Sequence, residues 1–216
     1  MLFFILIIGV FVHDGIQAFG NTTQSGSDII YLDKPLNNRN RNGYAYSTPQ
    51  FFLRTQTPVS FYFTTAMVGF VKVPGLSLAL HHSRARLYEI RFQGSLYTTA
   101  LAKRSYIRIM IDDAILISNK LYPNTEERKR LDPSFENNLL NSDMQGGIYL
   151  FSSSSNIVFP CVKFETAYIP AGTHSIDVVI RTEDTIIVHG SELFVKVFDI
   201  DESSQSSLPL VQTVSG

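Results

Sequence analysis

No tryptophan occurs among the 216 residues of the sequence, and Cys161 is its only cysteine. A single thiol cannot form an internal disulfide, which excludes the small disulfide-stapled scaffolds of secreted proteins. Without tryptophan the chain lacks the commonest stacking platform for sugars, although its 10 tyrosines can replace it in part. Cys161 has three interpretations: a buried small hydrophobe, half of an intermolecular disulfide, or a reactive thiol.

No apolar run is long enough to cross a membrane as a helix, which needs about 20 residues. The run Leu2–Val12 has instead the length of a signal-peptide core, and the small residue Ala18 follows it. We expect residues 1–18 to be a signal peptide and the remaining chain to be secreted. An uncleaved anchor and a buried strand are the alternatives.

Charge is scarce and balanced. Without Asp14 of the leader, the 19 acidic residues become 18, equal to the 18 basic residues. A neutral chain lacks the positive field that attracts phosphate backbones, so nucleic acid is not an expected partner.

Catalytic motifs are missing as well. The sequence contains no G-x-S-x-G, no H-E-x-x-H and no P-loop. His81 and His82 are neighbours on a predicted strand and point to opposite faces, so we expect a surface strand end and not a metal site. His174 lies at the rim of an apolar face, where we expect a packed, hydrogen-bonded residue. We expect no enzymatic activity, no cofactor and no bound metal.

Two acidic groups, Asp112-Asp113 and Asp199 to Glu202, are the candidates for calcium. A turn accounts for the first pair. The second begins a polar tail and lacks the glycine and terminal glutamate of a known loop pattern, so we expect solvated carboxylates at both places.

The chain divides into four parts by composition. After the leader we expect a flexible polar arm at residues 19–48, which carries the only glycosylation sequon at Asn21. Residues 49–200 form the folded domain, which is long enough to bury one core without staples. Residues 201–216 read as a disordered tail.

The folded domain has a period of two far more often than 3.6, which indicates strands. In Ser105–Ile111, Ile107, Ile109 and Ile111 share one face, and Asp112-Asp113 then makes a hairpin turn. Pro160 removes a hydrogen-bond donor from its strand and indicates an edge or a bulge. The other predicted strands are Val59–Phe63, Met67–Val73, Leu76–Leu80, Leu87–Phe92, Leu96–Leu101, Ile148–Phe151, Ile157–Phe164, Ile186–His189, Glu192–Phe198, and strands beginning at Ile115 and His174.

One long segment, Leu121–Gly147, interrupts the strands. Long connections in compact domains tend to be functional or mobile. Asp132-Pro133 predicts the start of a short helix through about Leu140, and the charge run EERKR reads as a solvated surface. The candidate binding residues in this segment are Asn124, Glu126, Arg128, Arg130 and Asp143.

The order of these features resembles the jelly-roll modules of the C1q/TNF-like superfamily. The stretches that carry the resemblance are VPGLSLAL at Val73, LYEIRFQGS, YIRIMIDDAILIS, FETAYIPAGTHSIDVVI and SELFVKVF. The resemblance spans about Phe51 to Phe198 and implies an all-β antiparallel jelly-roll sandwich of about ten short strands. Carbohydrate-binding jelly rolls share parts of this pattern and are the nearest alternative.

Two functions follow. The first is a secreted recognition module that binds a glycan or an extracellular protein through the Leu121–Gly147 loop. The second is a structural protein that self-assembles, as a homotrimer if it follows the C1q/TNF-like type. In the second, outward apolar residues such as Met110, Phe194 and Phe198 contact a neighbouring subunit, unless a loop of the same chain covers them.

Overall fold

The computed structural model describes residues 28–33, 49–64, 68–99, 101–131, 139–199 and 209–214. The expected signal peptide, the sequon at Asn21 and the Asp132-Pro133 helix start lie outside these residues. Within them, no helix has the length and apolar character that crossing a membrane requires.

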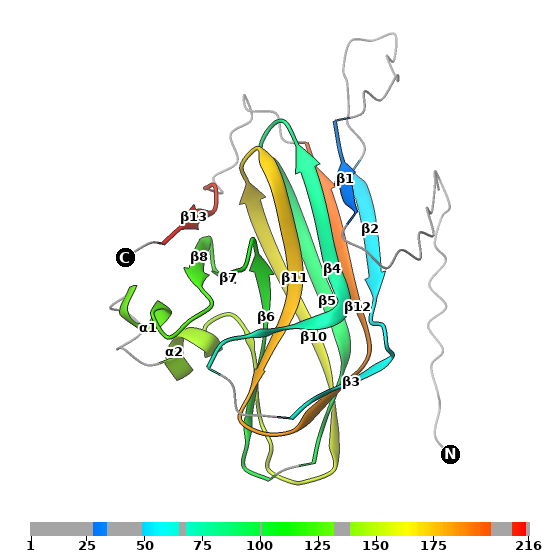
Figure 1. Cartoon of the computed structure of the whole chain (residues 1–216), viewed down its shortest axis with the longest axis vertical. Helices are drawn as coiled ribbons and strands as arrows, with labels where there is room; N and C mark the ends of the chain where they lie inside the picture. The colour runs from blue at the N-terminus through cyan, green and yellow to red at the C-terminus, as the bar shows by residue number, and fades with distance from the viewer. Residues whose placement is uncertain are drawn as a thin grey trace, which may run out of the picture.

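Two β-sheets pack face to face (Figure 1). The five-stranded sheet contains β10 (Ile157–Ile169), β5 (Arg86–Thr98), β12 (Ile186–Phe198) and β2 (Gln50–Thr55), with β3 (Ser60–Phe63) also paired to β12. The eight-stranded sheet contains β1 (Ile29–Tyr31), β4 (Val71–His82), β11 (Gly172–Thr182), β6 (Arg104–Ile111), β7 (Ala114–Ile117), β8 (Lys120–Pro123) and β13 (Gln212–Thr213), with β9 (Ile148–Phe151) paired to β6.

Eight of these strands follow the order of a jelly roll. They are, along the chain, β2, β4, β5, β6, β9, β10, β11 and β12. The first, eighth, third and sixth of them lie side by side in one sheet, and the second, seventh, fourth and fifth lie side by side in the other. The predicted all-β jelly-roll sandwich is therefore confirmed.

A segment that we name the insertion, residues 112–147, separates β6 from β9. It begins with the predicted hairpin, since β6 and β7 are joined by Asp112 and Asp113, whose positive φ angles of 52° and 61° suit a two-residue turn. It continues through β8 and the short helices α1 (Arg128–Leu131) and α2 (Leu139–Met144). The predicted loop therefore starts inside a strand, and residues 139 and 140 belong to a helix that extends to Met144.

The strands are longer than the sequence predicts. The sequence predicts two strands in each of three regions, near residues 67–80, 87–101 and 186–198. The structure has one strand in each region: β4, β5 and β12. Turn-like glycines caused the difference. Gly75 bends β4 with a φ of 80°, and Gly190 lies in a register shift of β12, but the ladder continues beyond both.

The main core lies between the two sheets. It contains the inward side chains of every second position, including the predicted row Ile107, Ile109 and Ile111 on β6. His174 shares its face of β11 with Ile176, Val178 and Ile180, as predicted, and these three side chains are in the same core. The turn Pro170-Ala171 before it takes the chain from one sheet to the other.

Parts of the expected arm and tail are ordered, which corrects the sequence prediction for those residues. Within residues 19–48, β1 pairs in parallel with β4, and Leu32 is buried in the core. Within residues 201–216, β13 pairs in parallel with β8, and Leu210 bridges to Tyr168. Each strand is too short to be signalled by its own sequence, and each gains its hydrogen bonds from a strand already present.

Replacing Ile109 with alanine should lower the free energy of unfolding by about 2–5 kcal/mol, because this fully buried side chain would leave a cavity between the sheets. Chemical denaturation measures the loss. The matched control is Val59→Ala, since Val59 is exposed and lies outside the sheets, and it should change stability by less than about 0.5 kcal/mol. Equal losses for the two variants would contradict the assignment of the core.

Candidate functional site

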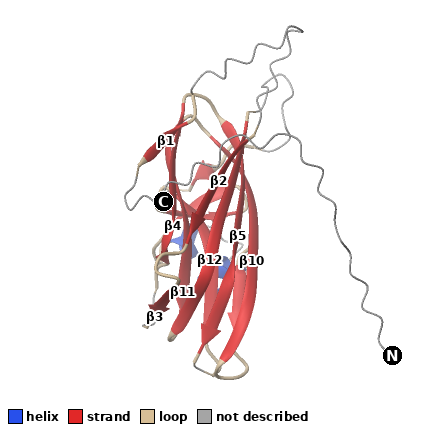
Figure 2. Ribbon diagram, turned by 90° about the vertical axis from the view of Figure 1, so that its right-hand side faces the viewer, coloured by secondary structure: helices blue, strands red, loops and turns tan. Residues whose placement is uncertain are grey.

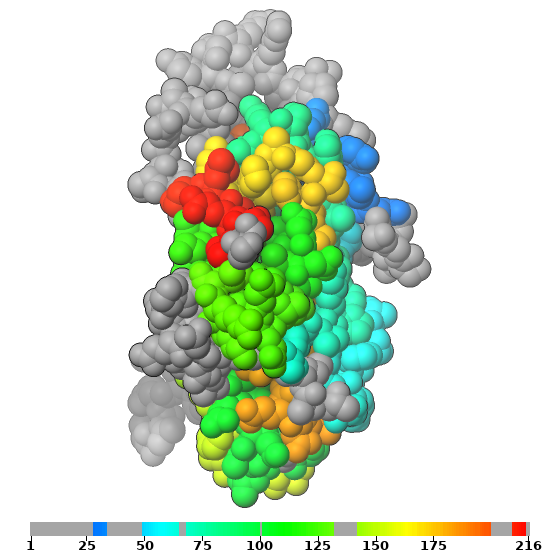
Figure 3. Space-filling model, turned by 60° about the vertical axis from the view of Figure 1, so that its left-hand side comes forward, coloured from blue at the N-terminus to red at the C-terminus, as the bar shows by residue number. Residues whose placement is uncertain are grey.

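The insertion covers the outer face of β6 and of the adjoining part of β11 in the eight-stranded sheet. Tyr106 and Met110 on β6 and Val179 on β11 point away from the main core and form a second apolar cluster with Phe70, Ile115, Ile117 and Tyr122. Figure 3 shows the insertion, in green, spread over this side of the molecule. Met110 is thus covered by its own chain, and the expectation that it contacts a neighbouring subunit is wrong.

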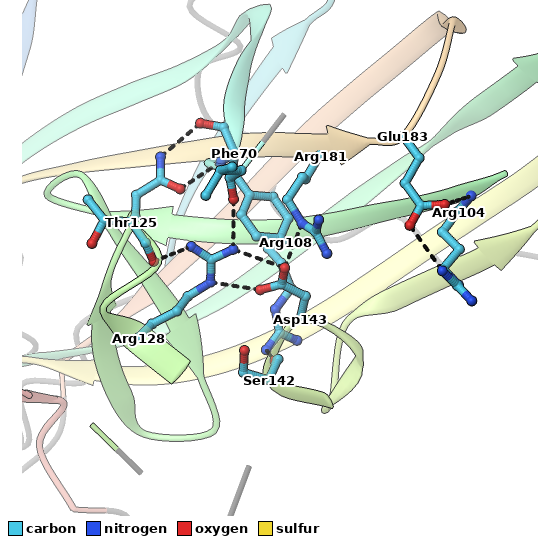
Figure 4. A network of polar contacts seen from close by, with 11 residues as sticks. Phe70, Arg104, Arg108, Thr125, Arg128, Ser142, Asp143, Arg181 and Glu183 are labelled. Carbon is cyan, nitrogen blue, oxygen red and sulfur yellow. Dashed lines mark hydrogen bonds and ion pairs between the residues drawn. The ribbon is translucent and has the colours of Figure 1, made fainter. Parts of the chain in front are cut away.

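A buried ion pair holds the insertion in place. Arg128 of α1 donates to both carboxylate oxygens of Asp143 on α2, at 2.8 and 2.9 Å, and both side chains are fully buried. Arg128 also donates to the carbonyls of Thr125 and Val68 and lies over the ring of Phe70. Each of the three guanidinium nitrogens of Arg128 therefore has a hydrogen-bond partner inside the protein (Figure 4).

Two further arginines reach the same place from the sheet. Arg181 of β11 lies 2.6 Å from Asp143 and over the ring of Tyr106. Arg108 of β6 is fully buried and donates to the carbonyl of Ser142 at 3.3 Å. Burial lowers the pKa of Arg108 to about 10, so it remains a cation at neutral pH. The Asp143 carboxylate thus joins both helices of the insertion to β11, and the Ser142 carbonyl joins α2 to β6.

Gly147 lets the insertion approach Arg108 closely. A Cβ at this position would lie 2.7 Å from Cδ and Nη1 of Arg108, closer than side-chain atoms can pack. Gly147 at the end of the insertion therefore has a packing role.

The predicted binding residues do not form one surface. Asn124 is engaged by the backbone of Phe70, accepting from its amide and donating to its carbonyl. Arg128 and Asp143 are buried as described, so the prediction that EERKR is solvated is wrong for Arg128. Glu126 and Arg130 are exposed, and Glu126 pairs with Lys129 at 3.6 Å.

The histidines behave differently from one another. His174 is packed and hydrogen-bonded, as predicted, with Nδ1 2.6 Å from Asp112 and Nε2 3.0 Å from the carbonyl of Pro170. His81 and His82 differ in exposure as expected of opposite faces, but His82 is fully buried and is not a surface residue. His189 lies in the other sheet and bonds Ser60, so it does not meet His174.

The remaining candidates have structural partners. Cys161 is buried in the main core, and burial raises the pKa of its thiol to about 11, which favours the first of its three interpretations. Asp113 pairs with Lys72, and Asp199 pairs with Arg84 and Arg86. Among the described residues, no three histidine, cysteine or acidic side chains lie close enough to share a metal ion.

The outer face of the five-stranded sheet, which we name the open face, is not covered by any described residue of the insertion. In Figure 2 its strands β10, β5, β12 and β2 lie side by side, and the helices lie behind them. Large apolar side chains on the two outer strands are between 49% and 62% exposed. They are Phe51 and Leu53 on β2, and Val158, Val162 and Phe164 on β10.

Charged residues occupy the middle of the open face. The strand register places Phe164, Arg91, Phe194 and Leu53 in one row across the four strands. Gln93 and Glu192 lie in the next row and are hydrogen-bonded to each other, and Arg91 donates to Gln93. On the other side, Lys196 pairs with Glu89 and lies over the rings of Phe51 and Phe198. A shallow hollow is lined by Leu53, Arg91, Gln93, Glu192 and Phe194.

The sequence pointed to only part of this face. The sequence predicts that Phe194 and Phe198 point outward, because their neighbours Leu193, Val195 and Val197 fit the apolar pattern of the inward face. Phe51 and Leu53 were missed because β2 was not predicted. The alternation of Phe51 and Leu53 with Phe52, which packs on the core, is the signal that could have found them.

The chain matches no protein-family model and no curated protein by sequence. The resemblance to C1q/TNF-like proteins is therefore limited to the β-sandwich fold. The chain is similar to solved structures of infectious bursal disease virus. For the Gx strain the identity is 10%, with 71% of this chain and 33% of that chain covered and a TM-score of 0.35.

For the T=1 particles derived from the same virus, identity is 12%, coverage is 71% of this chain and 32% of that chain, and the TM-score is 0.37. For the VP2 subviral particle the identity is 10%, with 78% and 42% covered and a TM-score of 0.29. The chain thus spans about a third of the length of the first two. Likeness at this level transfers no function.

Replacing Asp143 with asparagine should destabilise the protein by about 3–5 kcal/mol, because Arg128 and Arg181 would lose their shared carboxylate in a buried place. Thermal or chemical denaturation measures this loss. Arg130→Gln in α1 is the control, and the loss of its exposed side chain should change stability by less than about 0.5 kcal/mol. A tolerated Asp143→Asn would show that the ion pair does not hold the insertion.

Proposed function

We propose that this protein is a structural, non-enzymatic protein that assembles with copies of itself through the open face. The observation that carries the proposal is the exposure of Phe51, Leu53, Val162 and Phe164 on one side of a sheet whose other side is the core. Exposed apolar side chains gathered on one face of a sheet mark interaction sites, because leaving them in water is costly.

The charges of the open face favour a second copy as the partner. Glu89 and Glu192 are balanced by Arg91 and Lys196. A surface that binds a strongly acidic or basic partner would carry one sign in excess. A patch with equal numbers of both signs can complement itself across a two-fold axis, since each residue then meets a different residue of the same patch.

The edge of the same sheet disfavours strand-to-strand pairing. On the edge strand β10, Pro160 lacks an amide hydrogen, and Lys163 and Glu165 point inward and form an ion pair at 2.6 Å. Proline and inward-pointing charges are devices that protect sheet edges from other strands. Association through the face, sheet against sheet, is the arrangement that remains.

The size of the open face is sufficient. Three of its strands have 13 residues each. These three strands and the 6-residue β2, about 4.8 Å apart and rising about 3.3 Å per residue, offer roughly 700 Å². That is about what each partner contributes to a standard stable interface.

The proposal includes secretion, which the apolar run Leu2–Val12 supports. The C1q/TNF-like resemblance implies a trimer, whereas a self-complementary face gives a dimer. Recognition of a glycan or another extracellular protein through the insertion is less well supported. Of its five candidate residues, Arg128 and Asp143 are buried against each other, Asn124 is hydrogen-bonded to the backbone of Phe70, and Glu126 pairs with Lys129.

The purified mature chain should form dimers at micromolar concentration, and Phe164→Glu should return it to a monomer, because the substitution puts an unpaired charge in the contact. Light scattering after gel filtration measures the mass. Leu101→Glu is the matched control, since Leu101 is equally exposed but lies outside the sheets, and it should leave the dimer intact.

A wild-type monomer at 100 µM, on the order of a hundred times a typical micromolar dissociation constant, would contradict the proposal. A trimer that Phe164→Glu dissociates would keep the open face as the interface and replace the two-fold arrangement.

A further inference from the structure

Two imidazoles lie together where β4 ends and β11 begins. The ring centroids of His82 and His174 are 5.5 Å apart. His174 has an acceptor at each nitrogen: the Asp112 carboxylate at Nδ1 and the Pro170 carbonyl at Nε2. Since two acceptors require two donors, the doubly protonated form of His174 is the one that satisfies both. The hydrogen bond to Asp112 raises its pKa accordingly.

His82 is the neutral member of the pair. Its Nδ1 lies 2.6 Å from the carbonyl of Arg84 and must carry the single proton that is donated there. Its Nε2 is buried and has no hydrogen-bond partner. A second proton at Nε2 would therefore find no acceptor, and it would place a cation beside His174 and Arg86. Burial, followed by these two cations, lowers the pKa of His82.

The segment of residues 28–33 lies along the end of β4, beside His81 and His82. Tyr31 stacks on His81 at the exposed face, with ring centroids 5.0 Å apart. The following residue, Leu32, lies on the inward face with Ile30, where His82 is also buried. The Leu32 amide donates to the carbonyl of His81. The Asp33 carboxylate accepts from the Ser83 amide at 2.6 Å and from Arg86 at 3.4 Å.

We propose that His82 makes the docking of residues 28–33 on β4 sensitive to pH, so that mild acid releases the segment by protonating this imidazole. Release gives water access to Nε2 and leaves the end of β4 as an unpaired strand edge. This inference does not depend on the proposed function, because it concerns contacts within one chain.

The other titratable groups around His82 do not produce the same change between pH 7.5 and 5. Asp33 has a lowered pKa and weakens docking only below its ordinary value of 3.8. His174 has a raised pKa, so its contribution is complete in acid and is lost as the pH rises, which is the opposite direction. Burial keeps Tyr88 neutral by raising its pKa. Arg84 and Arg86 pair with Asp199, and these arginines stay charged throughout.

Hydrogen exchange of the Leu32 amide in the full chain tests the proposal, after correction for the pH dependence of the intrinsic exchange rate. If the docked state takes no proton and the released state has an ordinary imidazole, exchange should be about 30-fold faster at pH 5.0 than at pH 7.5. His82→Asn can still donate to the Arg84 carbonyl and takes no proton, so the acceleration should disappear. His81→Asn, on the exposed face, is the control and should retain it.

No acceleration in the wild type would overturn the proposal, and so would an unchanged acceleration in His82→Asn. If His82→Asn releases the segment at both pH values, this variant cannot show the loss of the acceleration. The proposal is then tested by titrating the imidazoles of the wild-type protein by nuclear magnetic resonance. A pKa of His82 below the ordinary value of about 6.5 supports the proposal, and one at or above it refutes the proposal.

Discussion

Strand β6 has apolar side chains on both of its faces, and the protein must cover both. Ile107, Ile109 and Ile111 pack between the sheets, while Tyr106 and Met110 point outward. A strand with one wet face would alternate apolar and polar residues, so this sequence needs a second cover on the far side of the sheet. The insertion provides that cover, and the buried pair of Arg128 and Asp143 fixes it there.

This requirement makes the two sheets unequal. In the eight-stranded sheet, the other sheet covers the inner face and the insertion covers the outer face of β6 and the adjoining part of β11. The described residues cover the five-stranded sheet on its inner face alone. Phe51, Leu53 and Phe164 are then left on the surface. The insertion therefore has a packing role in the fold, and the exposed apolar side chains lie on the opposite side of the molecule.

The sequence predicted what depends on local pattern. The fold class, the hairpin at Asp112-Asp113, the edge position of Pro160 and the packing of His174 all follow from side-chain alternation or turn chemistry, and the structure bears them out. The buried state of Arg128 could not be predicted, because its partner Asp143 is 15 residues away and is brought near only by the docking of two short helices. The pairing of β1 with β4 could not be predicted either, because the two strands are far apart in the sequence and meet only in the folded chain.

The open face as a contact between copies is the central claim, and hydroxyl-radical footprinting at two protein concentrations tests it most directly. Raising the protein concentration from below to above the dissociation constant of the assembly should protect Phe51, Phe164 and Phe194 from labelling. Leu101 and Tyr31, which are exposed elsewhere, should be labelled equally at both concentrations. Unchanged labelling of the three phenylalanines at the higher concentration would contradict the account.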